Sequence, residues 1–170
     1  MISANTIKYF RKKYNLFACT GILYNHESPR RPDHFVSQKI ISGLINIKKN
    51  KNNFLKLANT KISKDWSHAS DVVDALILMA NAKTPDDYII SSGIKRSILD
   101  FIKITAKKLN IKNWKEKIKI DKKIIKSNFS NVPLVGNSIK IRKKLKWSNK
   151  IKFERLIDEM IEYKLNKKKL

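Results

Sequence analysis

Hydrophobic and polar positions change their spacing several times along the chain. One face of residues 2–14 gathers Ile2, Tyr9 and Phe10, which predicts a helix there. Asn15 can end this helix in the left-handed conformation. The following run, residues 16–24, is almost continuously apolar. Such a run predicts a central strand that is covered on both faces of its sheet.

The rest of the chain alternates between predicted helices and short strands. Asp33 is a candidate cap for a helix at 34–48, and Ser97 with Asp100 predicts a capping box for a helix at 98–109. Other helices are expected from Ser67 or Ser70 to about 82, at 138–145 and at 153–164. Short strands are expected at 54–57, at 88–90 and around Ile118 and Ile120. Residues 59–64 and 128–137 are predicted to be loops. This alternation predicts an α/β fold.

Composition narrows the classes of protein to which the chain could belong. The 170 residues carry a formal net charge of +24, which admits a nucleic-acid-binding protein. The lysines are scattered rather than gathered into one stripe, and this argues against specific nucleic-acid binding. They favour a solvated basic surface with affinity for polyanionic ligands. No apolar run approaches a membrane span, and no signal peptide is recognisable, so we expect a cytoplasmic protein without a membrane partner. Cys19 is the single cysteine, which excludes an internal disulfide and a cysteine-rich metal site.

The candidate site is the stretch 21–31, where an apolar strand gives way to directed polar groups. Asn25, His26, Arg30 and Arg31 could donate hydrogen bonds to phosphate or ribose oxygens. Ligand sites of α/β proteins form outside the carboxyl ends of strands. The alternative interpretation is a polar loop closed by an ordinary Ser-Pro turn, and composition alone leaves both open.

Residues 16–31, with the sequence LFACTGILYNHESPRR, closely resemble GDP-mannose 4,6-dehydratases of the extended short-chain dehydrogenase/reductase superfamily. The resemblance continues in order along most of the chain, at residues 35–40 (FVSQKI), 57–59 (LAN), 64–71 (KDWSHASD), 86–93 (DDYIISSG) and 136–147 (GNSIKIRKKLKW).

The resemblance implies the C-terminal part of such an enzyme. Residues 1–33 would form the end of a Rossmann-type core, with the last strand or strands of its sheet. Residues 34–165 would form mainly the small α/β substrate-binding subdomain, and 166–170 a frayed tail. The family's glycine-rich loop and catalytic Tyr-x-x-x-Lys pair have no counterpart here. Tyr9 and Lys13 have that spacing, but they lie too close to the strand and are expected to be an exposed pair. No catalytic residue and no metal ligand is therefore assigned, and whether the chain is an enzyme is left open.

The resemblance also implies roles for five residues. His26 and Arg31 match positions that contact NADP, and Asn25 and Lys39 match substrate contacts. Lys64 stands where the family has an arginine on the substrate diphosphate, and a lysine lacks its bidentate fork. Residues 128–133 contain neither the arginine nor the acidic residue that the family has around the guanosine ribose.

These roles define the leading hypothesis and its alternatives. The chain would supply the nucleotide-sugar-binding portion of an NADP-dependent enzyme that converts GDP-mannose to GDP-4-dehydro-6-deoxy-mannose. NADP would be shared with an N-terminal half, without which the chain would be inactive. The first alternative is a non-catalytic nucleotide-sugar-binding remnant, and the second a basic nucleic-acid-binding protein. The strand at 16–23 would leave an open sheet edge and an apolar face, so a partner chain or a homo-oligomer is expected.

Overall fold

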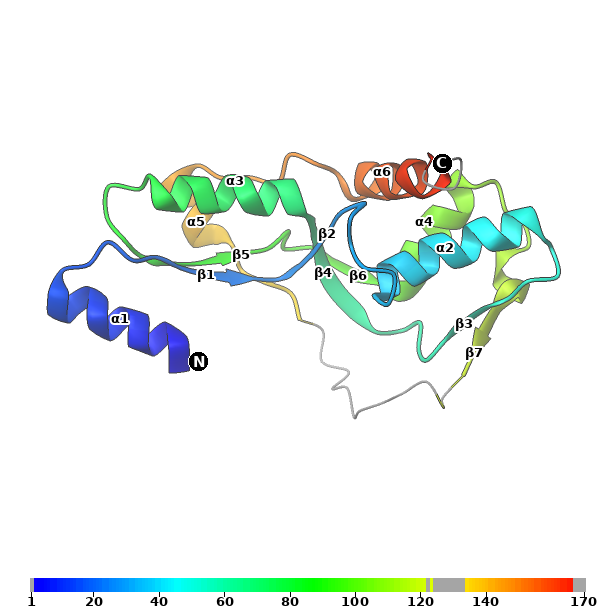
Figure 1. Cartoon of the computed structure of the whole chain (residues 1–170), viewed down its shortest axis with the longest axis horizontal. Coiled ribbons are helices and arrows are strands. Elements are labelled where there is room, and N and C mark those ends of the chain that lie inside the picture. Colours follow the sequence, from blue (N-terminus) through cyan, green and yellow to red (C-terminus); the bar gives the residue numbers. More distant parts are fainter. Residues whose placement is uncertain (1, 122, 124–133, 167–170) are drawn as a thin grey trace.

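The computed structural model describes residues 2–121, 123 and 134–166, and Figure 1 shows their arrangement. The helices are α1 (Ile2–Tyr14), α2 (Val36–Lys49), α3 (Ala69–Ala80), α4 (Ile98–Lys108), α5 (Ile139–Leu145) and α6 (Phe153–Asn166), with the short 3-10 helix η1 (Trp114–Lys117). The strands are β1 (Thr20–Leu23), β2 (Asn25–Glu27), β3 (Leu55–Leu57), β4 (Ser63–His68), β5 (Asp87–Ile90), β6 (Lys95–Ser97) and β7 (Ile118–Ile120). Within these ranges no helix has both the length and the apolar character required to cross a bilayer.

The described strands form three small sheets. β1 pairs in parallel with β5, and β3 pairs in parallel with β7. Between them lies a sheet of order β2-β4-β6, in which β4 is parallel to β2 and antiparallel to β6. The α/β class predicted from the alternating pattern is therefore confirmed.

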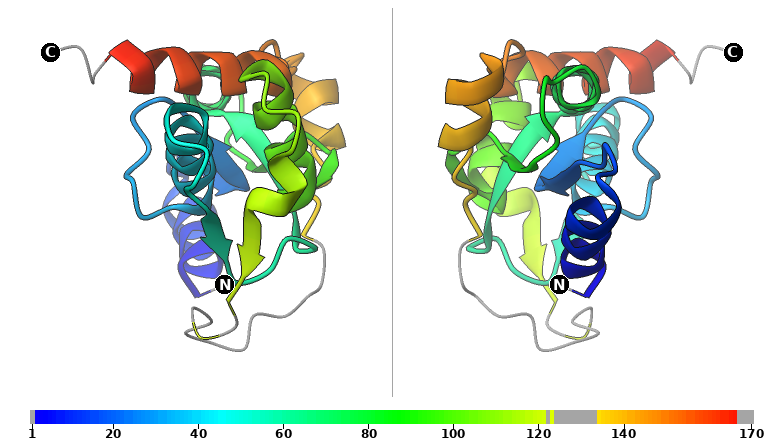
Figure 2. Two further views of the ribbon diagram at one scale, coloured as in Figure 1. Left: turned by 90° about the vertical axis from the view of Figure 1, so that its right-hand side faces the viewer. Right: turned by 90° about the vertical axis from the view of Figure 1, so that its left-hand side faces the viewer.

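Two apolar clusters hold these sheets to the helices. The larger joins α2, α4 and α6, and at its centre Trp66 contacts the rings of Phe101 and Phe153. The smaller lies between α3, α5 and β5 and includes Ile90, Ile141 and Trp147. Figure 1 shows the two groups of helices on either side of the central sheet, and Figure 2 shows α6, in red, lying across α2 and α4.

β1 differs from its prediction as a central, fully covered strand. It is shorter than predicted and has one neighbouring strand, β5, among the described residues. Ile22 and Leu23 are 47% and 41% exposed, and Leu16 and Phe17 before the strand are exposed too. The continuous apolar pattern is thus typical of a buried strand, but the described residues leave one edge and part of one face of β1 uncovered. The open edge and apolar face expected for an isolated strand are confirmed.

Several predicted boundaries are confirmed, and others are wrong. α1 has the predicted bounds, Asn15 has a φ of 52°, and the capping box of Ser97 and Asp100 is present. Asp33 does not cap α2, because a turn from Pro32 to Phe35 separates them, and Asp33 instead pairs with Lys164.

The predicted loop at 59–64 was also partly wrong, since β4 begins at Ser63 and its partner β6 was not predicted. Pairing between distant segments stabilises these polar strands, and hydrophobic spacing does not reveal such pairing. Of the predicted irregular segment at 128–137, residues 128–133 lie outside the described residues, as do residues 167–170 of the predicted tail.

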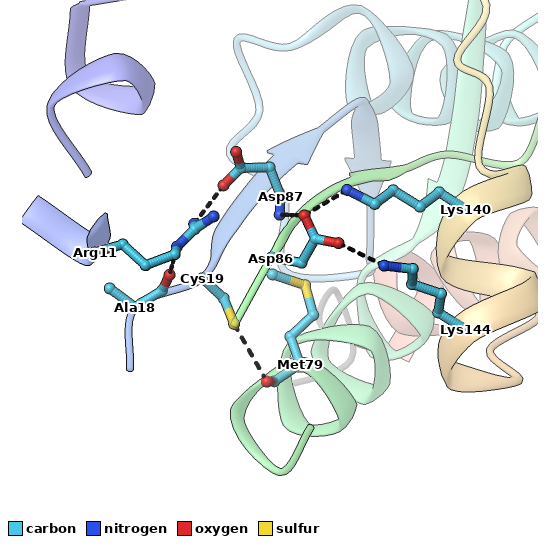
Figure 3. Close-up of polar contacts among 8 residues, drawn as sticks. All are labelled: Arg11, Ala18, Cys19, Met79, Asp86, Asp87, Lys140 and Lys144. Atoms are coloured by element: carbon cyan, nitrogen blue, oxygen red, sulfur yellow. Dashed lines mark hydrogen bonds and ion pairs between the residues drawn. The ribbon is translucent and has the colours of Figure 1, made fainter. Parts of the chain in front are cut away.

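Polar contacts fasten the β1–β5 pair to its neighbouring helices (Figure 3). Arg11 of α1 donates from Nε to the main-chain oxygen of Ala18 at 2.7 Å and from Nη2 to Asp87 Oδ1 at 2.6 Å. On the segment before β1, the Cys19 thiol lies 3.5 Å from the main-chain oxygen of Met79. The cysteine is thus used in packing against α3.

Asp86, immediately before β5, joins that strand to α5. Its two carboxylate oxygens accept hydrogen bonds from Lys140 at 2.5 Å and from Lys144 at 2.9 Å (Figure 3). Partial burial opposes ionisation of Asp86, but the bonds from the two lysines outweigh it and hold the pKa of this carboxyl well below its ordinary value.

We predict that Asp86→Asn lowers the free energy of unfolding at pH 7 by about 0.5–1 kcal/mol, because exposed ion pairs contribute little. The lowered pKa means that the contribution of Asp86 is present above about pH 4 and is lost as the pH falls through its lower folded-state pKa. Urea unfolding of the unsubstituted chain and of Asp86→Asn should therefore show a smaller difference in free energy of unfolding at pH 3 than at pH 7. Glu116→Gln is the control: it removes an exposed carboxylate of η1 that has no ion pair among the described residues, and it should change the free energy of unfolding by less than about 0.5 kcal/mol at either pH. Equal differences at both pH values for Asp86→Asn would contradict the assignment.

Candidate functional site

The candidate site forms where the chain passes from one sheet to the next. β1 ends at Leu23, β2 begins at Asn25, and Tyr24 between them donates its N–H to the main-chain oxygen of Ile90 at 3.1 Å. β1 is parallel to β5, and β2 to β4, so the chain changes partners at this residue. Polar side chains after such a change of partner lie at the edge where α/β proteins bind ligands.

A cleft of about 420 Å³ lies at this position. Its lining residues are Ile22, Leu23, Tyr24, Asn25, His26, Arg31 and Leu134. Three of the five residues predicted for the site, Asn25, His26 and Arg31, are thus brought together. Lys39 lies exposed on α2. Lys64 lies on β4 beside the cleft, where its main chain forms an isolated parallel β-bridge with Leu134. Neither lysine lines the cleft.

Glu27 anchors the polar segment to α2. It is 3% exposed, and its Oε2 accepts a hydrogen bond from Ser37 Oγ at 2.7 Å and lies 3.5 Å from Arg31 Nε. Burial raises the pKa of Glu27, while Ser37, Arg31 and more distant cations act against that rise. Gln38 adds a hydrogen bond to the main-chain oxygen of Pro29 at 3.2 Å. Side chains of α2 therefore hold the loop after β2 in place, and this loop positions Arg31.

Arg31 combines a fixed position with unused hydrogen-bonding capacity. Its guanidinium lies 3.6 Å from the centre of the Phe35 ring, and its side chain is 25% exposed. Although buried, Nε has no hydrogen-bond partner among the described residues. Nε faces the Glu27 carboxylate, so the groups left to donate to a ligand oxygen are Nη1 and Nη2, which make no hydrogen bond among the described residues.

His26 and Asn25 are oriented by main-chain oxygens. His26 Nδ1 lies 3.1 Å from the oxygen of Tyr24, which assigns the proton to Nδ1 and leaves Nε2 as an acceptor in the neutral ring. Asn25 donates from Nδ2 to the oxygen of Asp65 at 3.4 Å. The cleft therefore offers a guanidinium, an imidazole and a carboxamide, a set suited to phosphate, ribose or amide groups.

Asp65 is the residue of the site that hydrophobic patterning missed. It is fully buried on β4, and its Oδ1 accepts from the N–H of Ser92 at 2.8 Å and from its hydroxyl at 2.5 Å. Its Oδ2 accepts from the N–H of Gly93 at 2.9 Å and from that of Gly136 at 3.2 Å. A Cβ on Gly136 would lie 2.5 Å from Ser91 and 2.8 Å from the Tyr24 ring, so only glycine fits there.

Two features of the sequence could have indicated this role of Asp65: a carboxylate directly before Trp66 in a polar segment, and the Ser-Ser-Gly turn at residues 91–93. Neither feature of the sequence shows that the two segments meet; the fold does.

The described residues hold no group of three His, Cys, Asp or Glu side chains that could bind a metal. Tyr9 is 55% exposed with Lys13 Nζ 5.3 Å from its ring centre, as expected for an exposed pair on α1.

Two solved structures illustrate the fold that this chain shares with known proteins. A dTDP-glucose 4,6-dehydratase from Bacillus anthracis aligns with a TM-score of 0.82 at 14% identity, over 98% of this chain and 50% of that one. A UDP-glucose 4-epimerase from Thermotoga maritima aligns with a TM-score of 0.78 at 15% identity, over 96% of this chain and 50% of that one. The chain therefore has the fold of about half of each of these two proteins, which confirms the partial α/β fold that the sequence resemblance implied.

Sequence comparison identifies the family within that class. The chain is 37% identical over 158 residues to GDP-mannose 4,6 dehydratase 1 of Arabidopsis thaliana, covering 92% of this chain and 43% of that protein. It is 32% identical over 170 residues to human GDP-mannose 4,6 dehydratase, covering 89% and 45%. The family model of GDP-mannose 4,6 dehydratase matches residues 1–160. The chain belongs to the GDP-mannose 4,6-dehydratase family, and it spans less than half the length of these relatives.

We predict that Asp65→Asn lowers the free energy of unfolding by about 3 kcal/mol or more, because an amide nitrogen cannot accept the hydrogen bonds that the lost oxygen received. Asp74→Asn is the matched control, since Asp74 is 41% exposed and pairs with the exposed Lys150. The control should cost less than about 1 kcal/mol. Urea unfolding measures both values, and a cost for Asp65→Asn no larger than that of Asp74→Asn would refute the role given to Asp65.

Proposed function

We propose that this chain supplies the nucleotide-sugar-binding portion of a GDP-mannose 4,6-dehydratase-like enzyme and one wall of its nicotinamide site. The observation that carries the proposal is the convergence of Asn25, His26 and Arg31 on one cleft at the end of β2. The family and the names of its members support GDP-mannose as the substrate. Lys64 beside the cleft and Lys39 on α2 are proposed substrate contacts, and a cytoplasmic setting belongs to the same proposal.

The cleft fits a nicotinamide cofactor on its hydrogen-bonding groups. The Nη groups of Arg31 and the acceptor Nε2 of His26 complement phosphate and carboxamide groups respectively. Among the structural neighbours, one dehydratase was solved with NAD and another protein, from Pseudomonas aeruginosa, with NADPH. We propose NADP here, held by His26 and Arg31. When bound, a nicotinamide accepts hydride from the substrate and returns it. The residues of this chain bind and orient; none of the assigned ones abstracts the proton.

The catalytic groups are proposed to come from a Rossmann-type half that these 170 residues do not include. The proposed docking position is the edge of β1 opposite β5, because no described strand pairs with it and the exposed Ile22 and Leu23 lie on this strand. Val73, Leu76 and Ile77 of α3 are also exposed, which extends the apolar surface. A second copy of this chain is the alternative occupant of the same edge.

We predict that the purified chain shows no turnover of GDP-mannose with NADP, while calorimetry detects NADP binding. Arg31→Gln should weaken that binding about tenfold or more, because a bond to a charged group contributes about 1.5–3 kcal/mol. Arg30→Gln is the matched control: Arg30 is exposed and does not line the cleft. Turnover by the chain alone would refute the division of roles, and equal weakening by both variants would refute the role of Arg31.

We further predict that the chain alone self-associates on size-exclusion chromatography through the β1 edge. Ile22→Lys should shift it toward the monomer, since a charge on an edge strand opposes pairing. Ile139→Lys, at an exposed residue of α5, should leave the elution unchanged. A monodisperse monomer of the unsubstituted chain would contradict the docking position.

A further inference from the structure

A second pocket, of about 360 Å³, lies away from the cleft and shares no lining residue with it. Its walls come from β4, from the segment after β5, from β6, from α5 and from the linker between α5 and α6. Three cationic side chains, Arg96, Arg142 and Lys152, line it together with one carboxylate, Glu154. No role assigned above uses this pocket.

Arg142 is held in this pocket by neutral groups. Its Nε donates to Ser138 Oγ at 2.9 Å, and its Nη2 donates to Asn149 Oδ1 at 2.8 Å and to the main-chain oxygen of Ser92 at 3.3 Å. The guanidinium lies 5.2 Å from the centre of the Trp147 ring. No carboxylate of the described residues forms an ion pair with it. The guanidinium is thus fixed in place with its charge uncompensated.

Arg96 and Lys152 add charge that is weakly compensated. Arg96 lies 4.6 Å from the centre of the Phe153 ring, and its nearest acidic partner, the half-exposed Glu154, is 4.0 Å away. Lys152 is exposed and has no ion pair within the described part of the chain. The three cations exceed the single carboxylate by two charges.

The remaining lining residues complete a site for a group with several oxygens. Ser67 is 5% exposed, and its Oγ accepts a hydrogen bond from Asn149 Nδ2 at 3.4 Å, which leaves its hydroxyl hydrogen available. Ile94 and Ile151 provide apolar surface. We propose that this pocket binds a phosphate-bearing small molecule, with the phosphate between Arg96 and Arg142 and the organic part against the two isoleucines.

A phosphate fits this pocket better than a single carboxylate does. A phosphate monoester carries a charge of about −1.5 to −2 at neutral pH, which matches the excess of two positive charges. Arg96 can donate paired hydrogen bonds to its oxygens, and Arg142, whose Nε and Nη2 are occupied, can donate from Nη1. The bound group would therefore join β6 to α5. This site is independent of the NADP contacts proposed at His26 and Arg31 and of the proposed substrate contacts, none of which lines it.

Calorimetric titration with phenyl phosphate in 150 mM salt tests the proposal, since this probe combines a phosphate with an apolar ring. We expect saturable binding that Arg96→Gln and Lys152→Gln each weaken severalfold. Arg142→Gln should weaken it about tenfold or more, because a bond to a charged group contributes about 1.5–3 kcal/mol. Arg142 also makes structural contacts, so the Arg96 and Lys152 variants keep the test valid if Arg142→Gln does not fold.

Two control variants separate this site from net charge and from the cleft. Lys103→Gln removes one charge from an exposed residue of α4 outside the pocket and should leave binding unchanged. Arg31→Gln should also leave it unchanged, whereas it weakens NADP binding. Equal weakening by Lys103→Gln and Arg96→Gln would reduce the effect to net charge and overturn the proposal. Loss of phenyl phosphate binding in Arg31→Gln alone would place the anion in the cleft and overturn it too.

Discussion

The buried carboxylate of Asp65 is the contact on which the arrangement of both pockets depends. It gathers main-chain N–H groups from Ser92, Gly93 and Gly136, of which the last lies 71 residues away along the chain. Gly136 packs beside Tyr24, which lines the cleft, and Ser92 lines the second pocket. A charged group in the interior is stable only when its hydrogen bonds are complete, so these segments must meet for the fold to form.

The second constraint is the incomplete sheet at β1. This strand is apolar enough for the interior, yet it has one strand neighbour among the described residues and two exposed large side chains. The same strand leads directly into Asn25 and His26. The exposed strand and the polar residues of the cleft therefore belong to one continuous segment, so any segment that paired with the free edge of β1 would lie beside the cleft.

Electrostatics distinguishes specific anion contacts from the general charge of the surface. The net charge of +24 is spread over scattered lysines that solvent and salt screen. Arg31 and Arg142 differ because neighbouring groups hold each guanidinium in one place, through Phe35 and Glu27 in one case and through neutral oxygens in the other. Fixed guanidiniums lose little freedom on binding, so they can select a ligand where mobile lysines can only attract one.

The sequence by itself determined the α/β class, the bounds of α1, the capping box at Ser97 and the grouping of Asn25, His26 and Arg31, because local spacing and one strand-to-loop transition specify all of these. The sequence also indicated the family, through the motif at residues 16–31. Only the tertiary structure decided that β4 and β6 are strands, that Asp33 does not cap α2 and that β1 lies at an edge. It alone placed Lys39 outside the cleft and brought Arg96 and Arg142 together. Those features depend on pairing and hydrogen bonds between residues far apart in the chain, which no local pattern encodes.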